Sequence, residues 1–150
     1  MATDLPRSPA GLIPADVLRR IPGCGSGVPP QDVALLSGGG CHNRCLRVTT
    51  SAGRFVLRQR IDTGERPGAL PLQELRCHRA AAALGIAPAI VDADDDGQWM
   101  VMAFVDAPLW QADDLLRPER LEALGGRLAL LHGTAPPGVA GLDALAIVDA

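Results

Sequence analysis

Hydrophobic and polar residues alternate with a period of two in several short segments, which is typical of strands with one buried face. The clearest segment is 53–60, where Phe55 and Leu57 share one face while Val56 and Arg58 share the other. Alternation of this kind, bounded by turn residues, predicts strands at 32–36, 44–50, 53–60, 89–94 and 98–104.

Helical spacing predicts three further elements. A short helix is expected over 14–21, and an alanine-rich helix over 72–84, before the Gly85 that ends it. A third helix begins near Pro118, and Gly125-Gly126 in its middle either permits close packing or breaks it. The apolar stripe of this helix is formed by Leu121, Leu124, Leu128 and Leu131.

Composition is that of an ordinary globular chain. A length of 150 residues favours one domain, and 47% hydrophobic with 21% charged residues suits a packed core. The net charge of −3 gives no reason to expect nucleic acid as a partner. All 14 basic residues are arginine, so any cation used in binding or catalysis must be an arginine.

The chain shows no sign of a membrane or secretory destination. Its first residues, MATDLPRSPAGL, lack the basic start and apolar segment of a signal peptide. No stretch approaches the roughly 20 apolar residues that cross a bilayer. We therefore expect a cytoplasmic protein that does not bind membranes.

The cysteines do not predict a metal site. Cys24, Cys41, Cys45 and Cys77 are irregularly spaced and form no CxxC pair. Cys41-His42 with Cys45 lacks the second pair of ligands that a structural metal site needs. Free thiols are the expected state.

A glycine-rich stretch, LSGGGCHNR at 36–44, lies between two predicted strands. The dinucleotide-binding pattern GxGxxG and the Walker A pattern GxxxxGK[ST] both open a helix. Neither fits, because Asn43 stands in place of the third glycine and no lysine follows. A glycine turn inside a hairpin, folded over the phosphates of ATP, is the arrangement that kinases use.

Four pieces occur in order over 32–132: SGGGCHNR, FVLR, a glutamate ten residues before the start of LGIAP, and VMAFVDAP. Together they resemble the N-terminal half of the aminoglycoside phosphotransferase and choline kinase family. These relatives of protein kinases phosphorylate a hydroxyl of a small molecule with ATP and magnesium.

The resemblance implies an α+β fold, with a protein-kinase-like N-lobe of about five antiparallel strands plus one helix. The first helices of a C-lobe would follow. It implies three regions: an N-terminal extension with a short helix (1–31), the N-lobe and hinge (32–105) and the start of a truncated helical C-lobe (106–150).

By the same resemblance, the glycine turn would lie over the β- and γ-phosphates of ATP. The residues concerned are Ser37, Gly38, Gly39 and Gly40. Glycine lets backbone N–H groups approach an anion closely, and Asn43 would stabilise the loop by hydrogen bonding to its own backbone. The alternative is a plain tight hairpin.

Arg58 matches the cation that grips the α- and β-phosphates, where protein kinases have lysine and choline kinase-like members have arginine. Val56 shares its face and would form an apolar roof for adenine. Glu74, on the helix that follows, would orient the Arg58 guanidinium. The alternatives are a solvated strand arginine for Arg58 and a surface ion pair for Glu74.

The segment VMAFVDAP matches the hinge of the family. Met102 would close the back of the adenine pocket, although an ordinary core methionine explains it equally on composition. The carbonyl of Ala103 and the amide of Val105 would bond the edge of the adenine.

The residues of phosphoryl transfer itself are not found in the sequence. The family carries its catalytic Asp, a nearby Asn and a metal-binding Asp downstream of the leucine-rich helix, so we assign no catalytic or metal-binding residue. We expect the ATP-binding part of a truncated enzyme, inactive alone, with its magnesium ligands and its alcohol substrate depending on a missing C-terminal half.

Two other interpretations stay open. One is a non-catalytic nucleotide-binding or interaction module of the same fold. The other is a small α+β structural domain whose glycine turn is incidental. If the rest of a C-lobe is missing, the leucine stripe of the last helix would be left uncovered and would favour self-association.

Overall fold

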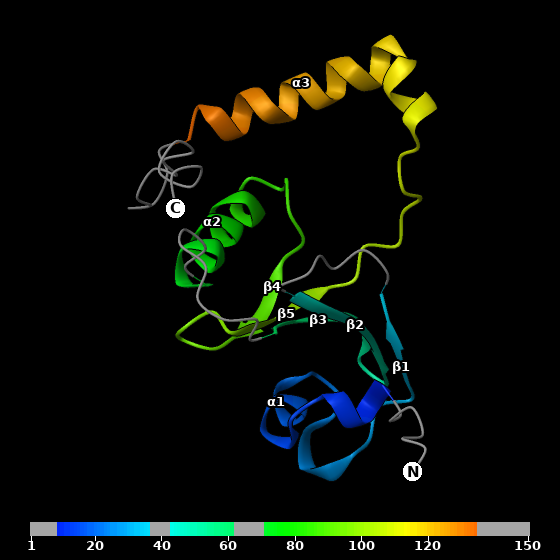
Figure 1. Cartoon of the computed structure of the whole chain (residues 1–150), viewed down its shortest axis with the longest axis vertical. Coiled ribbons are helices and arrows are strands. Elements are labelled where there is room, and N and C mark those ends of the chain that lie inside the picture. Colours follow the sequence, from blue (N-terminus) through cyan, green and yellow to red (C-terminus); the bar gives the residue numbers. More distant parts are fainter. Residues whose placement is uncertain (1–8, 37–42, 62–70, 135–150) are drawn as a thin grey trace, which may run out of the picture. The chain divides into compact units, whose positions relative to one another are not determined.

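The computed structural model describes residues 9–36, 43–61 and 71–134 (Figure 1). The chain divides into two compact units, one formed by 1–65 with 90–104 and the other by 66–89 with 105–150. Each unit is described by itself.

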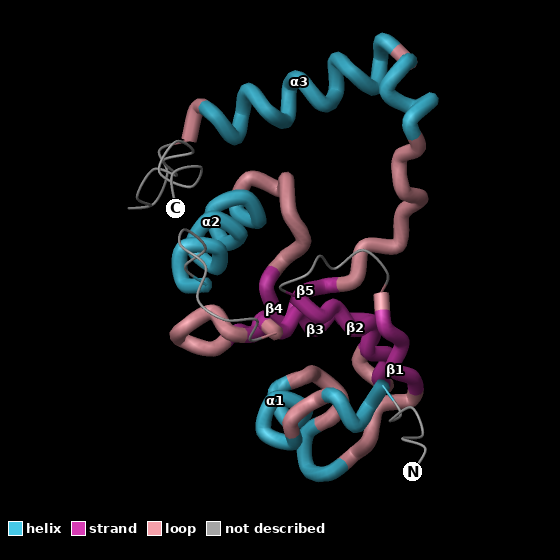
Figure 2. Tube along the Cα trace, viewed as in Figure 1, coloured by secondary structure: helices cyan, strands magenta, loops and turns pink. Residues whose placement is uncertain are grey.

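The first unit contains one five-stranded antiparallel sheet, drawn in magenta in Figure 2. Its strand order is β1-β2-β3-β5-β4, so β3 lies at the centre. The predicted bounds of the five strands are correct to within one residue at each end. The predicted α+β, kinase-like fold is confirmed. The strands are β1 (Asp32–Leu35), β2 (Asn43–Thr50), β3 (Gly53–Arg60), β4 (Ile90–Ala93) and β5 (Trp99–Ala103).

One face of this sheet forms the core of the unit together with α1 (Ala15–Arg20) (Figure 1). Short 3-10 turns flank α1 at Pro9–Leu12 and Gly25–Gly27, where the sequence predicted no element. Burial of this apolar surface attaches α1 to the sheet. The core residues are Ile13, Val17, Ile21, Cys24, Leu46, Val48, Phe55, Leu57 and Val101.

The second unit contains the predicted α2 (Pro71–Ala83). This helix ends where Gly85 adopts a left-handed conformation with φ +68°. The amides of Gly85 and Ile86 then donate to the carbonyls of Ala82 and Ala81, at 3.0 and 2.9 Å. Such bonds satisfy the last carbonyls of a helix, and glycine is the residue that reaches this conformation without steric cost.

The same unit contains a 3-10 turn at Ala112–Leu116 and α3 (Pro118–His132). The α3 helix continues through Gly125 and Gly126, and a Cβ added at either glycine would meet no atom within 4 Å. The glycine pair therefore neither breaks the helix nor marks close packing among the described residues. Within the described ranges, no helix has the length and apolar character needed to cross a bilayer.

Candidate functional site

The sheet has a second face, opposite the α1 core, on which several predicted site residues meet. Strand register pairs Val56 with Met102, and Arg58 with Met100. Directly opposed residues of antiparallel strands place their side chains on the same face. We call this surface the Arg58 face, defined by Val56, Arg58, Met100 and Met102.

The Arg58 face continues onto β2. Cys45 is the register partner of Arg58, and Asn43 is the partner of Arg60. Asn43, the first residue of β2, belongs to the glycine-rich stretch 36–44 and comes three residues after Gly40. Tertiary structure therefore brings Asn43, Val56, Arg58 and Met102 together on one surface.

The apolar residues of this face are separate from the core around α1. Met100 and Met102 are 2% and 8% exposed, yet neither belongs to the α1 cluster. Val56 and Arg58 are half-buried beside them. An apolar strip next to a guanidinium suits a ligand that has a flat apolar part and an anionic part.

The predicted hinge begins at the end of β5, where one backbone hydrogen bond sets the direction of the strand's polar groups. The amide of Phe104 donates to the carbonyl of Arg54 at 3.2 Å and so points toward β3. Successive residues of a strand direct their N–H and C=O groups to opposite sides, so those of Ala103, the last residue of β5, point away from β3. On that side the β4 ladder begins at Ile90, opposite Met102.

Two features of the side chains next to β5 are defined by the structure. The Arg54 guanidinium lies 4.9 Å from the centre of the Phe104 ring, which is a cation–π contact. Val105 is 58% exposed just beyond. Val105, the first residue of the second unit after β5, is therefore largely open to solvent.

Glu74 lies in the first turn of α2, in the second unit, and is exposed. Its predicted pairing with Arg58 joins the two units and stays a prediction. His78, one helical turn further along, bonds through Nε2 to the carbonyl of Pro88 at 2.9 Å. This histidine thus links α2 to the segment that follows it. The predicted phosphate turn, Ser37, Gly38, Gly39 and Gly40, lies outside the described residues.

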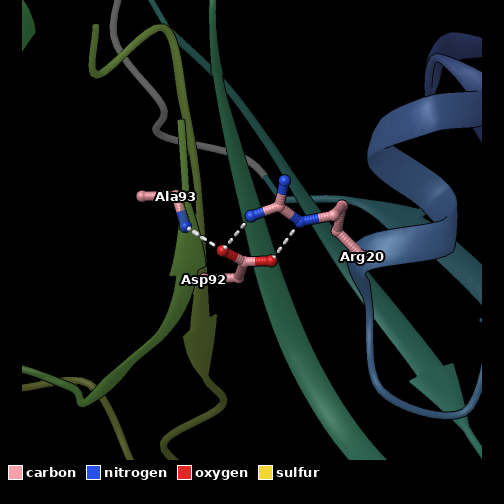
Figure 3. A network of polar contacts seen from close by, with 3 residues as sticks. All are labelled: Arg20, Asp92 and Ala93. Carbon is pink, nitrogen blue, oxygen red and sulfur yellow. Dashed lines mark hydrogen bonds and ion pairs between the residues drawn. The ribbon is translucent and has the colours of Figure 1, made fainter. Parts of the chain in front are cut away.

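The opposite face carries a polar cluster that the sequence analysis missed (Figure 3). Arg20 of α1 donates two hydrogen bonds to the carboxylate of Asp92 in β4, at 2.6 and 2.7 Å. The amide of Ala93 donates to the same carboxylate at 2.9 Å, and the Arg20 guanidinium lies 5.5 Å from the centre of the Trp99 ring. No local pattern signals a pair that is 72 residues apart.

The ion pair changes the acidity of both partners. Hydrogen bonding to Arg20 lowers the pKa of Asp92, and the same bond raises the pKa of Arg20. The pKa of the Cys24 thiol, in the core, is raised by desolvation, because burial disfavours the charged thiolate. In the described ranges no group of three or more histidine, cysteine, aspartate or glutamate side chains is arranged to hold a metal ion.

A family comparison identifies what kind of protein carries this sheet. Residues 33–147, from β1 to beyond α3, match the model of the phosphotransferase enzyme family. The chain belongs to that family. The predicted resemblance is thereby confirmed. Every predicted site residue lies within the matched residues 33–147. The α1 segment lies before it, and no curated protein matches the chain.

Proposed function

We propose that this chain is the ATP-binding part of a small-molecule phosphotransferase, which transfers the γ-phosphate of ATP to a hydroxyl of its substrate. The observation that carries the proposal is the register of β3 with β5, which sets Val56 beside Met102 and Arg58 beside Met100. Adenine would lie against the apolar pair at the hinge end. Its phosphates would extend along β3 toward Arg58.

Each residue has one task in this proposal. Val56 and Met102 contact the adenine ring, while the Ala103 carbonyl and the Val105 amide bond its edge. Arg58 binds the α- and β-phosphates through its planar guanidinium, which keeps its charge at any working pH. Glu74 orients that guanidinium from α2. Ser37, Gly38, Gly39, Gly40 and Asn43 enclose the outer phosphates.

Magnesium enters the proposal only with ATP, whose phosphate charge it partly neutralises. Mg²⁺ prefers carboxylate and water oxygens. The Arg58 face offers apolar side chains and a cation at its centre, so its residues fit the nucleotide and not the metal. No step is assigned to magnesium on this face. The proposed acceptor of the γ-phosphate is a small-molecule alcohol.

Nucleotide titration tests the proposal. ATP should bind the purified chain, and Arg58→Gln should weaken that binding by roughly tenfold or more, because a charge-assisted contact with phosphate is lost. Arg44→Gln is the matched control. Arg44 pairs with Gln59 and lies near Arg58 but on the opposite face, so its loss should leave binding unchanged.

Four outcomes are informative. Equal weakening by both substitutions would indicate nonspecific charge attraction, and no binding of ATP to the wild-type chain would overturn the proposal. Phosphoryl transfer to an alcohol by a chain extended through the family's catalytic motifs, in a screen of small hydroxylated molecules, would support the enzymatic form. Binding without transfer by a chain extended through the family's catalytic motifs would favour a non-catalytic nucleotide-binding module.

A further inference from the structure

A second arginine lies on the Arg58 face, further along the direction in which the proposed phosphates extend. Arg60 is two residues beyond Arg58 in β3, so both side chains leave the strand on the same face, about 6–7 Å apart along it. The order along β3, starting from the hinge, is Val56, Arg58 and then Arg60.

The position of Arg60 is well defined by the sheet. Its backbone amide donates to the carbonyl of Gln98 at 2.8 Å, and its register partner is Asn43. The side chain is half-buried. Two guanidinium groups in line, with an amide side chain at the far end, suit a chain of phosphates better than a single phosphate.

We propose that Arg60 binds the terminal phosphate of the nucleotide and so makes the site prefer nucleoside triphosphates over diphosphates. This inference rests on the proposed function, because it takes the adenine end of the site to be at Val56. Arg58 then contacts the phosphates that ATP and ADP share. Arg60 is the cation that only the longer phosphate chain reaches.

The test measures the dissociation constants of MgATP and MgADP for the full chain by calorimetry. Arg60→Gln should weaken MgATP binding by roughly tenfold and leave MgADP binding within about twofold of wild type. Arg60→Lys, which keeps the charge, should retain most of the preference. Arg58→Gln should weaken both nucleotides, and Arg44→Gln, on the opposite face, should weaken neither.

The outcomes separate this inference from the proposed function. If both nucleotides bind the wild-type chain but Arg60→Gln leaves their ratio unchanged, the role of Arg60 is wrong while the nucleotide site stands. An equal loss of preference in Arg44→Gln would also overturn it, because a general charge effect would then explain the result. If neither nucleotide binds the wild-type chain, both proposals fail.

Discussion

At the scale of single residues, the contact between Gly23 and Thr50 shows how closely the α1 segment approaches the sheet. Gly23 has φ +85°, and a Cβ added there would lie 2.6 Å from Oγ1 of Thr50. That hydroxyl donates to the carbonyl of Pro22 at 2.8 Å and accepts from the amide of Ala52 at 3.1 Å. Thr50 therefore joins the α1 segment to the β2–β3 turn.

We expect Gly23→Ala to lower the free energy of unfolding by about 2–4 kcal/mol, because backbone strain and a clash with Thr50 add together. Gly27→Ala is the control: Gly27 has φ +82° but open space around its Cβ position, so strain alone should cost about 1–2 kcal/mol. Urea denaturation of both variants measures the difference. Equal losses of unfolding free energy in the two variants would show that the contact of the added Cβ with Thr50 does not destabilise the protein.

At the scale of elements, the ion pair between Arg20 and Asp92 connects α1 to the edge strand β4. Both partners are partly exposed, with side chains 55% and 26% accessible. Exposed pairs contribute little to stability, and apolar burial remains the main attachment of α1. The pair therefore adds one polar contact between α1 and β4 to that apolar attachment.

Asp92→Asn should lower the melting temperature at neutral pH by about 4 °C or less. The pKa of Asp92 is lowered in the folded chain, so its stabilisation is complete above the ordinary carboxyl pKa of about 4. It is lost as the pH falls through the lowered pKa. The difference in melting temperature between the wild type and the variant should therefore become progressively smaller below about pH 4.

Thermal unfolding followed by circular dichroism measures this effect across a pH range from about two units below to about four units above the ordinary carboxyl pKa. Asp96→Asn serves as the control, because Asp96 is an exposed acid in the β4–β5 turn. If the difference in melting temperature between the wild type and Asp92→Asn stayed constant from neutral to acidic pH, the role given to the carboxylate of Asp92 would be contradicted.

At the scale of the whole molecule, the leucine stripe of α3 is the main apolar surface left exposed on a described helix. Leu121, Leu124, Leu128 and Leu131 are 49%, 36%, 42% and 37% exposed. Contiguous apolar surface of this kind favours association in water. We propose that the isolated chain self-associates through this stripe.

Leu124→Glu combined with Leu128→Glu should weaken self-association by more than about tenfold, because two charges would be buried at the contact. Leu116→Glu is the control, since Leu116 is 79% exposed but lies outside the stripe. Sedimentation over a range of concentrations measures the change. A wild-type chain that stayed monomeric throughout would contradict the proposal.

The sequence by itself determined the elements of this protein. Alternation in 53–60 placed Val56 and Arg58 on one face, and the structure agrees, with Phe55 and Leu57 buried on the other. Strand and helix bounds followed because period-two and helical patterns are local properties of the chain. The ordered motifs also identified the phosphotransferase family, which the match over 33–147 confirms.

Only the tertiary structure decided which of these residues become neighbours. Register alone sets Met102 beside Val56 and Asn43 beside Arg60, and packing alone makes α1 part of the sheet core. The pair formed by Arg20 and Asp92 arises in the same way. Such contacts join residues far apart in sequence, so they depend on the combined burial and hydrogen bonding of whole elements and leave no local pattern.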